Sequence, residues 1–119
     1  MSKSTPQSAV AFQLSAALES YQGHVDALMN PWRDHEHYEA VNRRLREVRK
    51  LKGALPQLSV SMVEVVIAHV ELMEALWEAS RRVAGEELGR LRTLRERHAA
   101  AVARMRTQCL RAFARSAAA

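Results

Sequence analysis

Apolar side chains recur at steps of three and four residues along four stretches of this chain, and no other feature restricts its fold as much. This spacing lines one face of an α-helix, whereas a half-buried strand would alternate in steps of two. Apolar residues also make up 48% of the 119 residues, which is enough to fill a core. We therefore predict an all-α fold, an antiparallel bundle of four helices at about 6–29, 35–54, 60–83 and 86–116.

The breaks between these helices are marked by residues that stop or start helical structure. Asn30-Pro31 is expected to end the first helix, and Pro56 closes the segment that follows the second. Ser61 and Glu64 have the spacing of a capping box, in which each side chain bonds to the backbone of the other residue. This pattern predicts that the third helix starts at about residue 60.

The join between the third and fourth helices admits two structures. The segment Val83-Ala84-Gly85 contains no proline and no capping side chain. The apolar stripe also continues through it without a change of helical phase. A tight hairpin at Gly85 gives a four-helix bundle. A helix continuous through it gives three helices, with the long one packed in a dimer. In both cases we expect residues 1–5 to be a flexible tail and residues 6–119 to form a single helical domain.

Charge alternates in sign along the chain, as expected if each helix lies beside its neighbour. The formal charges are −3, +5, −4 and +7 for residues 1–40, 41–60, 61–80 and 81–119. Within the last two segments the charged residues form two lines with seven-residue spacing, Glu64, Glu71 and Glu78, and Arg90, Arg97, Arg104 and Arg111. An antiparallel register centred on Ala84 predicts that the three acids face the first three arginines.

Two histidines and the single cysteine fall on apolar stripes. In the same register His69 and His98 lie at nearly the same level, so we expect them to face each other. They are interpreted either as a buried, hydrogen-bonded pair or as a pH-sensitive or catalytic pair. The position of Cys109 predicts a small buried hydrophobic residue rather than a reactive thiol.

The densest group of metal-type side chains is Asp34-His35-Glu36-His37. A metal site needs three or four ligands, and the sequence supplies no further partner for this turn, so we predict no metal and no cofactor. Glycine-rich phosphate loops and nucleophile motifs are also missing. We therefore expect a protein that is not an enzyme.

The chain carries 15 arginines against 3 lysines and a net charge of +5, which is compatible with binding to a polyanion. Seven arginines are possible phosphate-binding residues: Arg43, Arg44, Arg46, Arg49, Arg90, Arg97 and Arg104. Against this stand the acidic helices that can neutralise them, and the lack of nearby aromatic residues that would stack on bases. A solvated or interhelical charged face is the competing interpretation.

The third helix is apolar around most of its circumference, which predicts burial inside the bundle or at a subunit interface. We expect the interface residues to be Met62, Val66, Met73, Leu76 and Trp77. The sequence thus favours a non-catalytic, cytoplasmic interaction or assembly protein without a membrane partner. It is expected to bind itself, as a dimer or larger species, or another protein. The alternative is a nucleic-acid-associated accessory protein that binds the phosphate backbone.

Overall fold

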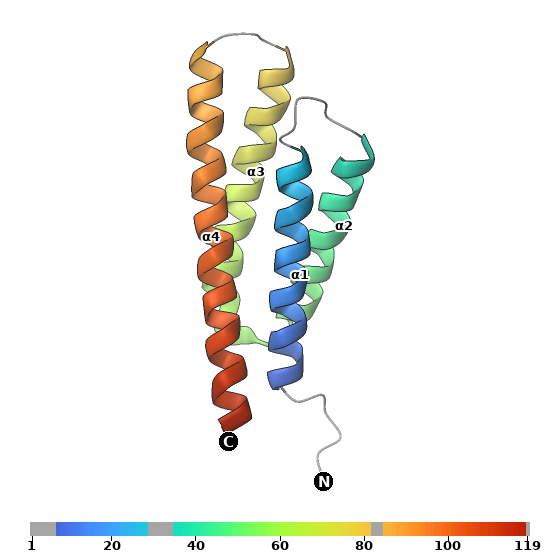
Figure 1. Ribbon diagram of the computed structural model, residues 1–119, viewed down its shortest axis with the longest axis vertical. Coiled ribbons are helices and arrows are strands. Elements are labelled where there is room, and N and C mark those ends of the chain that lie inside the picture. The colour runs from blue at the N-terminus through green and yellow to red at the C-terminus, as the bar shows by residue number, and fades with distance from the viewer. Residues whose placement is uncertain (1–6, 29–34, 82–84, 119) are drawn as a thin grey trace.

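The computed structural model describes residues 7–28, 35–81 and 85–118, and these form a helical bundle without strands (Figure 1). The elements are α1 (Gln7–Leu28), α2 (His35–Lys52), the short 3-10 helix η1 (Pro56–Leu58), α3 (Ser59–Arg81) and α4 (Gly85–Ala118). This confirms the predicted all-α four-helix bundle. Each predicted helix boundary lies within about two residues of the observed one, because the apolar periodicity stops where packing stops.

α3 and α4 are separate helices that lie side by side and run in opposite directions (Figure 1). Of the two structures that the sequence admits, the chain therefore adopts the hairpin rather than one continuous helix. The three residues between these helices lie outside the described part of the chain, as do Asn30-Pro31 and Asp34.

α1 and α4 each pack against two other helices, whereas α2 and α3 each pack mainly against one. α1 packs against α2 and α4, while α3 packs mainly against α4 and meets α2 only briefly. The molecule is elongated, with extents of 59 × 24 × 17 Å. At the end where α3 leads to α4, these two helices extend beyond α1 and α2 (Figure 1).

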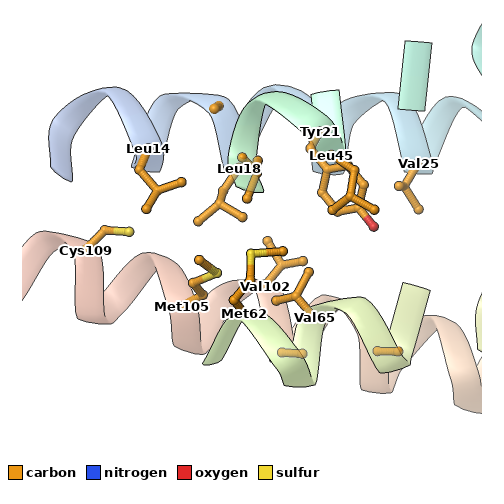
Figure 2. Close-up of a cluster of buried hydrophobic side chains, with 14 of the residues drawn as sticks. Leu14, Leu18, Tyr21, Val25, Leu45, Met62, Val65, Val102, Met105 and Cys109 are labelled. Carbon is orange, nitrogen blue, oxygen red and sulfur yellow. The ribbon is translucent and has the colours of Figure 1, made fainter. Parts of the chain in front are cut away.

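The core is formed by the predicted apolar stripes, which all four helices direct toward one another (Figure 2). Leu14 and Leu18 of α1 face Met62 of α3 and Met105 of α4 across the middle of the bundle (Figure 2). Cys109 is fully buried among them, which confirms its prediction as a small core residue. Burial raises the pKa of its thiol to about 11, and the nearby Arg106 opposes this shift.

The start of α3 differs from the sequence-based prediction. Ser61 lies inside the helix, where its hydroxyl donates a hydrogen bond to Gln108 Oε1 of α4, so it does not cap the helix. The chain instead enters α3 directly from η1, and the Ser59 hydroxyl donates to the carbonyl oxygen of Pro56 at 2.8 Å. The Leu58 amide donates to the carbonyl oxygen of Leu55 at 3.0 Å, and the Leu58 side chain is buried in the core, so the segment before α3 is held in a helical turn.

No helix within the described ranges is both long and apolar enough to cross a membrane.

Candidate interaction surface

The outward face of α3 carries large apolar side chains that the bundle does not cover. With their exposed fractions, they are Val60 (76%), Val63 (56%), Ile67 (54%), Val70 (47%) and Trp77 (61%). We call these five residues the α3 seam. Several large apolar side chains exposed along one face of a helix are a feature of interaction sites. The seam is therefore the strongest candidate for a functional surface on this chain.

The α3 seam has the spacing of a coiled-coil heptad. Its members follow one another in steps of three and four from Val60 to Val70, and Trp77 lies one heptad after Val70. Glu74 takes the remaining position of the pattern, so that one charged side chain interrupts an otherwise apolar line. On a helix, residues at these positions form a narrow stripe that fits against a second helix.

The structure places the predicted interface residues on another part of the helix. Met62 and Leu76 are buried in the core of the chain itself, and Val66 and Met73 are half-buried against that core. Trp77 alone lies on the exposed face. α3 is apolar on two faces, and sequence periodicity does not tell which face the chain's own helices cover. The spacing from Val60 to Val70 was the signal that could have identified the second face.

One border of the α3 seam is acidic, and the predicted register accounts for it. Arg90 lies 3.4 Å from Glu78, Arg97 lies 3.9 Å from Glu71, and Arg104 lies 3.9 Å from Glu64. The three pairs predicted from the antiparallel register are thus observed between α3 and α4. All six side chains are about half exposed, so these carboxylates also contact solvent.

The opposite border of the α3 seam faces α2, which is basic. The positive charge of Arg49, an exposed residue of α2, is close enough to His69 of α3 to lower the pKa of that ring. Arg46 lies one helical turn before Arg49 and is also exposed. The seam is therefore bordered by carboxylates on the α4 side, and α2 contributes further positive charge near α3.

The seven predicted phosphate-binding arginines do not form one basic surface. Three of them face the glutamates of α3, as described above. Arg44 lies 3.5 Å from Glu47 on the groove between α1 and α2, and Arg43 is exposed elsewhere on α2. The positive charge is thus divided between two helices, and carboxylates neutralise much of it.

The two predicted facing histidines do meet, and a tyrosine joins them. The hydroxyl oxygen of Tyr21 lies 2.7 Å from His69 Nδ1 and 2.7 Å from His98 Nε2. The ring centroids of His69 and His98 are 6.5 Å apart. Tyr21 and His98 are fully buried, and His69 is nearly so. Three helices thus contribute one ring each to a closed polar network in the core, which favours the interpretation as a buried, hydrogen-bonded pair.

The hydrogen-bonding pattern assigns the protons of this network. A hydroxyl has one proton, so Tyr21 donates to one histidine and accepts from the other. The Nδ1 atom of His98 is buried and has no hydrogen-bond partner among the described residues. A buried N–H without an acceptor is costlier than an unused lone pair, so the proton of His98 belongs on Nε2. His98 therefore donates to Tyr21, and Tyr21 donates to Nδ1 of His69.

Burial controls the ionisation of all three rings. It lowers the pKa of His98 to about 4, with a further decrease from His69 and an opposing effect of the Asp26 carboxylate. Burial and the positive charge of Arg49 lower the pKa of His69. Burial also raises the pKa of Tyr21. All three groups are therefore neutral near pH 7.

Within the part of the chain that the structure describes, no three His, Cys, Asp or Glu side chains are grouped to hold a metal ion. Asp34 and the side chains of His35, Glu36 and His37 lie outside that part, so the turn predicted to be rich in metal-type residues stays untested. Comparison of the chain with protein-family models, with characterised proteins and with solved structures gives no match.

Proposed function

We propose that this protein is a non-catalytic helical assembly protein that self-associates through the α3 seam. The observation that carries the proposal is the exposure of five large apolar side chains along one heptad-spaced line of α3. Leaving such a line in water costs free energy that burial against a second helix recovers, at roughly 25 cal/mol per Å² of apolar surface. The histidine network takes no part in this function because its rings are buried.

A second copy of the chain is the partner that best fits the α3 seam. The line is regular enough to pack against an identical line, because its members follow heptad spacing. Symmetric pairing is also the commonest way in which small soluble proteins assemble.

We take the exposed Arg46 and Arg49 of α2 as the basic border of the α3 seam, and with this border the charges favour pairing of two copies in parallel. If a two-fold axis runs along the seam, the helices are parallel and the acidic border of each copy meets the basic border of its partner. If the axis crosses the seam, the helices are antiparallel and like charges meet, which is unfavourable. The carboxylates of Glu64 and Glu71 would then lie near Arg46 and Arg49 of the other copy in the parallel arrangement only.

We expect Ile67→Glu to dissociate the protein into monomers, because it places a charge at the centre of the α3 seam. Burying that carboxylate without a partner is unfavourable by several kcal/mol, or on the order of 100-fold or more in the dissociation constant. Sedimentation or light scattering at tens of micromolar measures the change. Leu110→Glu is the matched control, because Leu110 is 50% exposed on α4 but lies outside the seam.

Replacement of Glu74, the charged residue within the α3 seam, should strengthen self-association. Glu74→Leu completes the apolar line and removes the repulsion between the two copies of Glu74 in a parallel pair. It is expected to tighten self-association. If the natural protein is monomeric at these concentrations and the Glu74→Leu variant is monomeric as well, the seam does not mediate self-association.

A further inference from the structure

The ladder of charges between α3 and α4 ends on an arginine that has no acid opposite it. Arg111 follows Arg104 by seven residues, and in the observed register it faces Gln57. Gln57 and Arg111 line the same surface hollow, which confirms that the register extends to this fourth step. An amide thus replaces the carboxylate that the preceding three steps would lead one to expect.

This hollow has a volume of about 230 Å³ and is lined by Gln57, Leu58, Gln108, Arg111 and Arg115. A neighbouring hollow of about 320 Å³ shares Gln108 and Arg111 and also contacts Arg104 and Thr107. No carboxylate lines either hollow among the described residues. In contrast, Glu47 lines the groove between α1 and α2, and the groove between α1 and α4 has Glu19 and Asp26.

The polar groups around the hollow are arranged as hydrogen-bond donors. The Oε1 atom of Gln108 already accepts a hydrogen bond from the Ser61 hydroxyl, which leaves the amide N–H groups of Gln108 to donate. Gln108 is half-buried and Ser61 is buried, so this amide is held in place. The guanidinium groups of Arg111 and Arg115 have donors only. Gln57 adds an amide that is free to rotate its N–H groups toward an anion.

We propose that this hollow is a binding site for a phosphate group, which takes the place of the missing fourth carboxylate. Two guanidinium groups one helical turn apart match the charge of a phosphate dianion and bind its oxygens through paired hydrogen bonds. The amides of Gln57 and Gln108 donate to the remaining oxygens. None of the residues that line the hollow belongs to the α3 seam, so phosphate binding can be measured separately from self-association.

Inorganic phosphate is the direct probe of this site, and NMR of the ¹⁵N-labelled protein is the measurement. At constant ionic strength, we expect saturable shifts of the side-chain signals of Gln57, Gln108, Arg111 and Arg115. Arg111→Gln should weaken phosphate binding about tenfold, because it removes a charge-assisted hydrogen bond. Arg90→Gln is the matched control, since Arg90 belongs to the same ladder but faces Glu78, and it should leave phosphate binding unchanged.

Gln57→Glu is a second variant, which tests whether phosphate binds because a carboxylate is missing opposite Arg111. It completes the ladder with a carboxylate opposite Arg111, and we expect this internal anion to abolish phosphate binding. Circular dichroism confirms that the variants stay folded, as expected for exposed positions. Shifts that grow linearly without saturation, or equal affinities in the natural protein, Arg111→Gln and Gln57→Glu, would overturn the proposal.

The source of the phosphate is resolved by competition. A short DNA duplex that displaces inorganic phosphate, with the same loss in Arg111→Gln, identifies the backbone of a nucleic acid as a ligand of this site. Binding of inorganic phosphate without binding of the duplex identifies a free phosphate or small phosphate ester. Both outcomes support a phosphate site, and they separate its two possible sources.

Discussion

The network of Tyr21, His69 and His98 is the chemically most constrained group of residues in this protein. Each ring comes from a different helix, and the two hydrogen bonds of 2.7 Å leave the Tyr21 hydroxyl with one proton donated and one accepted. An additional proton has no favourable place here. On His69 it would remove the acceptor of the Tyr21 hydroxyl, and on His98 it would create a buried N–H group without a partner.

This network predicts that the protein loses stability as the pH falls below the ordinary histidine range. The pKa of His98 decreases from 6.5 in the unfolded chain to about 4 in the folded one. Below pH 6.5 the unfolded chain therefore binds a proton that the folded chain does not, and its relative free energy decreases. We expect His98 alone to reduce the free energy of unfolding by about 3 kcal/mol between pH 7 and pH 4, measured by urea unfolding.

The charged groups near the network act in opposite directions on this pH dependence. Arg49 of α2 lowers the pKa of His69, whereas Asp26 of α1, itself 3.6 Å from Arg95 of α4, raises that of His98. His98→Gln keeps a donor to Tyr21 without titrating, so its stability should depend less on pH than that of the natural protein. His24→Gln serves as the control. Identical pH profiles for His98→Gln and the natural protein would contradict the prediction.

Among the helices, α3 and α4 show how a charge pattern specifies register without contributing much stability. Their three salt bridges have N–O distances between 3.4 and 3.9 Å and exposed partners. Solvent-exposed pairs of this kind contribute about 0–1 kcal/mol each. Their main effect is to disfavour shifted registers, in which like charges or unpaired charges would meet.

A double-mutant cycle on Glu71→Gln and Arg97→Gln measures the strength of one such pair. We expect a coupling free energy below about 1 kcal/mol, decreasing with added salt because both side chains are exposed. Thermal or urea unfolding of the two single variants and the double variant gives this value. A coupling of about 3 kcal/mol would mean that the pair is buried upon assembly, and that the α3 seam covers its border.

At the scale of the whole molecule, the proposed parallel pairing of two copies can be tested by cross-linking. In a parallel pair every seam residue lies beside its own copy, so both Val63→Cys and Val70→Cys should form a disulfide between the copies under oxidation. In an antiparallel pair at most one of the two positions lies on the two-fold axis, since the Cα atoms of a disulfide lie within about 7 Å of each other.

Non-reducing electrophoresis of the two separate variants distinguishes these arrangements. The natural Cys109 does not interfere, because it is fully buried and its thiol has a raised pKa. Leu110→Cys, exposed but outside the α3 seam, shows the background of random cross-linking. Cross-linking of Val63→Cys and Val70→Cys no greater than that of Leu110→Cys would exclude the parallel pair.

The sequence by itself determined the helices and their pairing. Steps of three and four in the apolar residues predicted the four helices, because this periodicity follows directly from helical geometry. The seven-residue spacing within the acidic line that contains Glu71, and within the basic line that contains Arg97, predicted the antiparallel register of α3 and α4. It also brought His69 to the level of His98. These properties depend on positions along one or two helices, which sequence spacing encodes.

Only the tertiary structure decided which surfaces remain exposed. It buried Met62 and left Ile67 in solvent, although both are apolar residues of one helix, because α4 covers a single face of α3. It brought Tyr21 between the two histidines, a contact that no spacing within α3 and α4 specifies. It also placed Arg111 at the edge of a surface hollow. Such features depend on how a third element packs, and the periodicity of one helix carries no information about that packing.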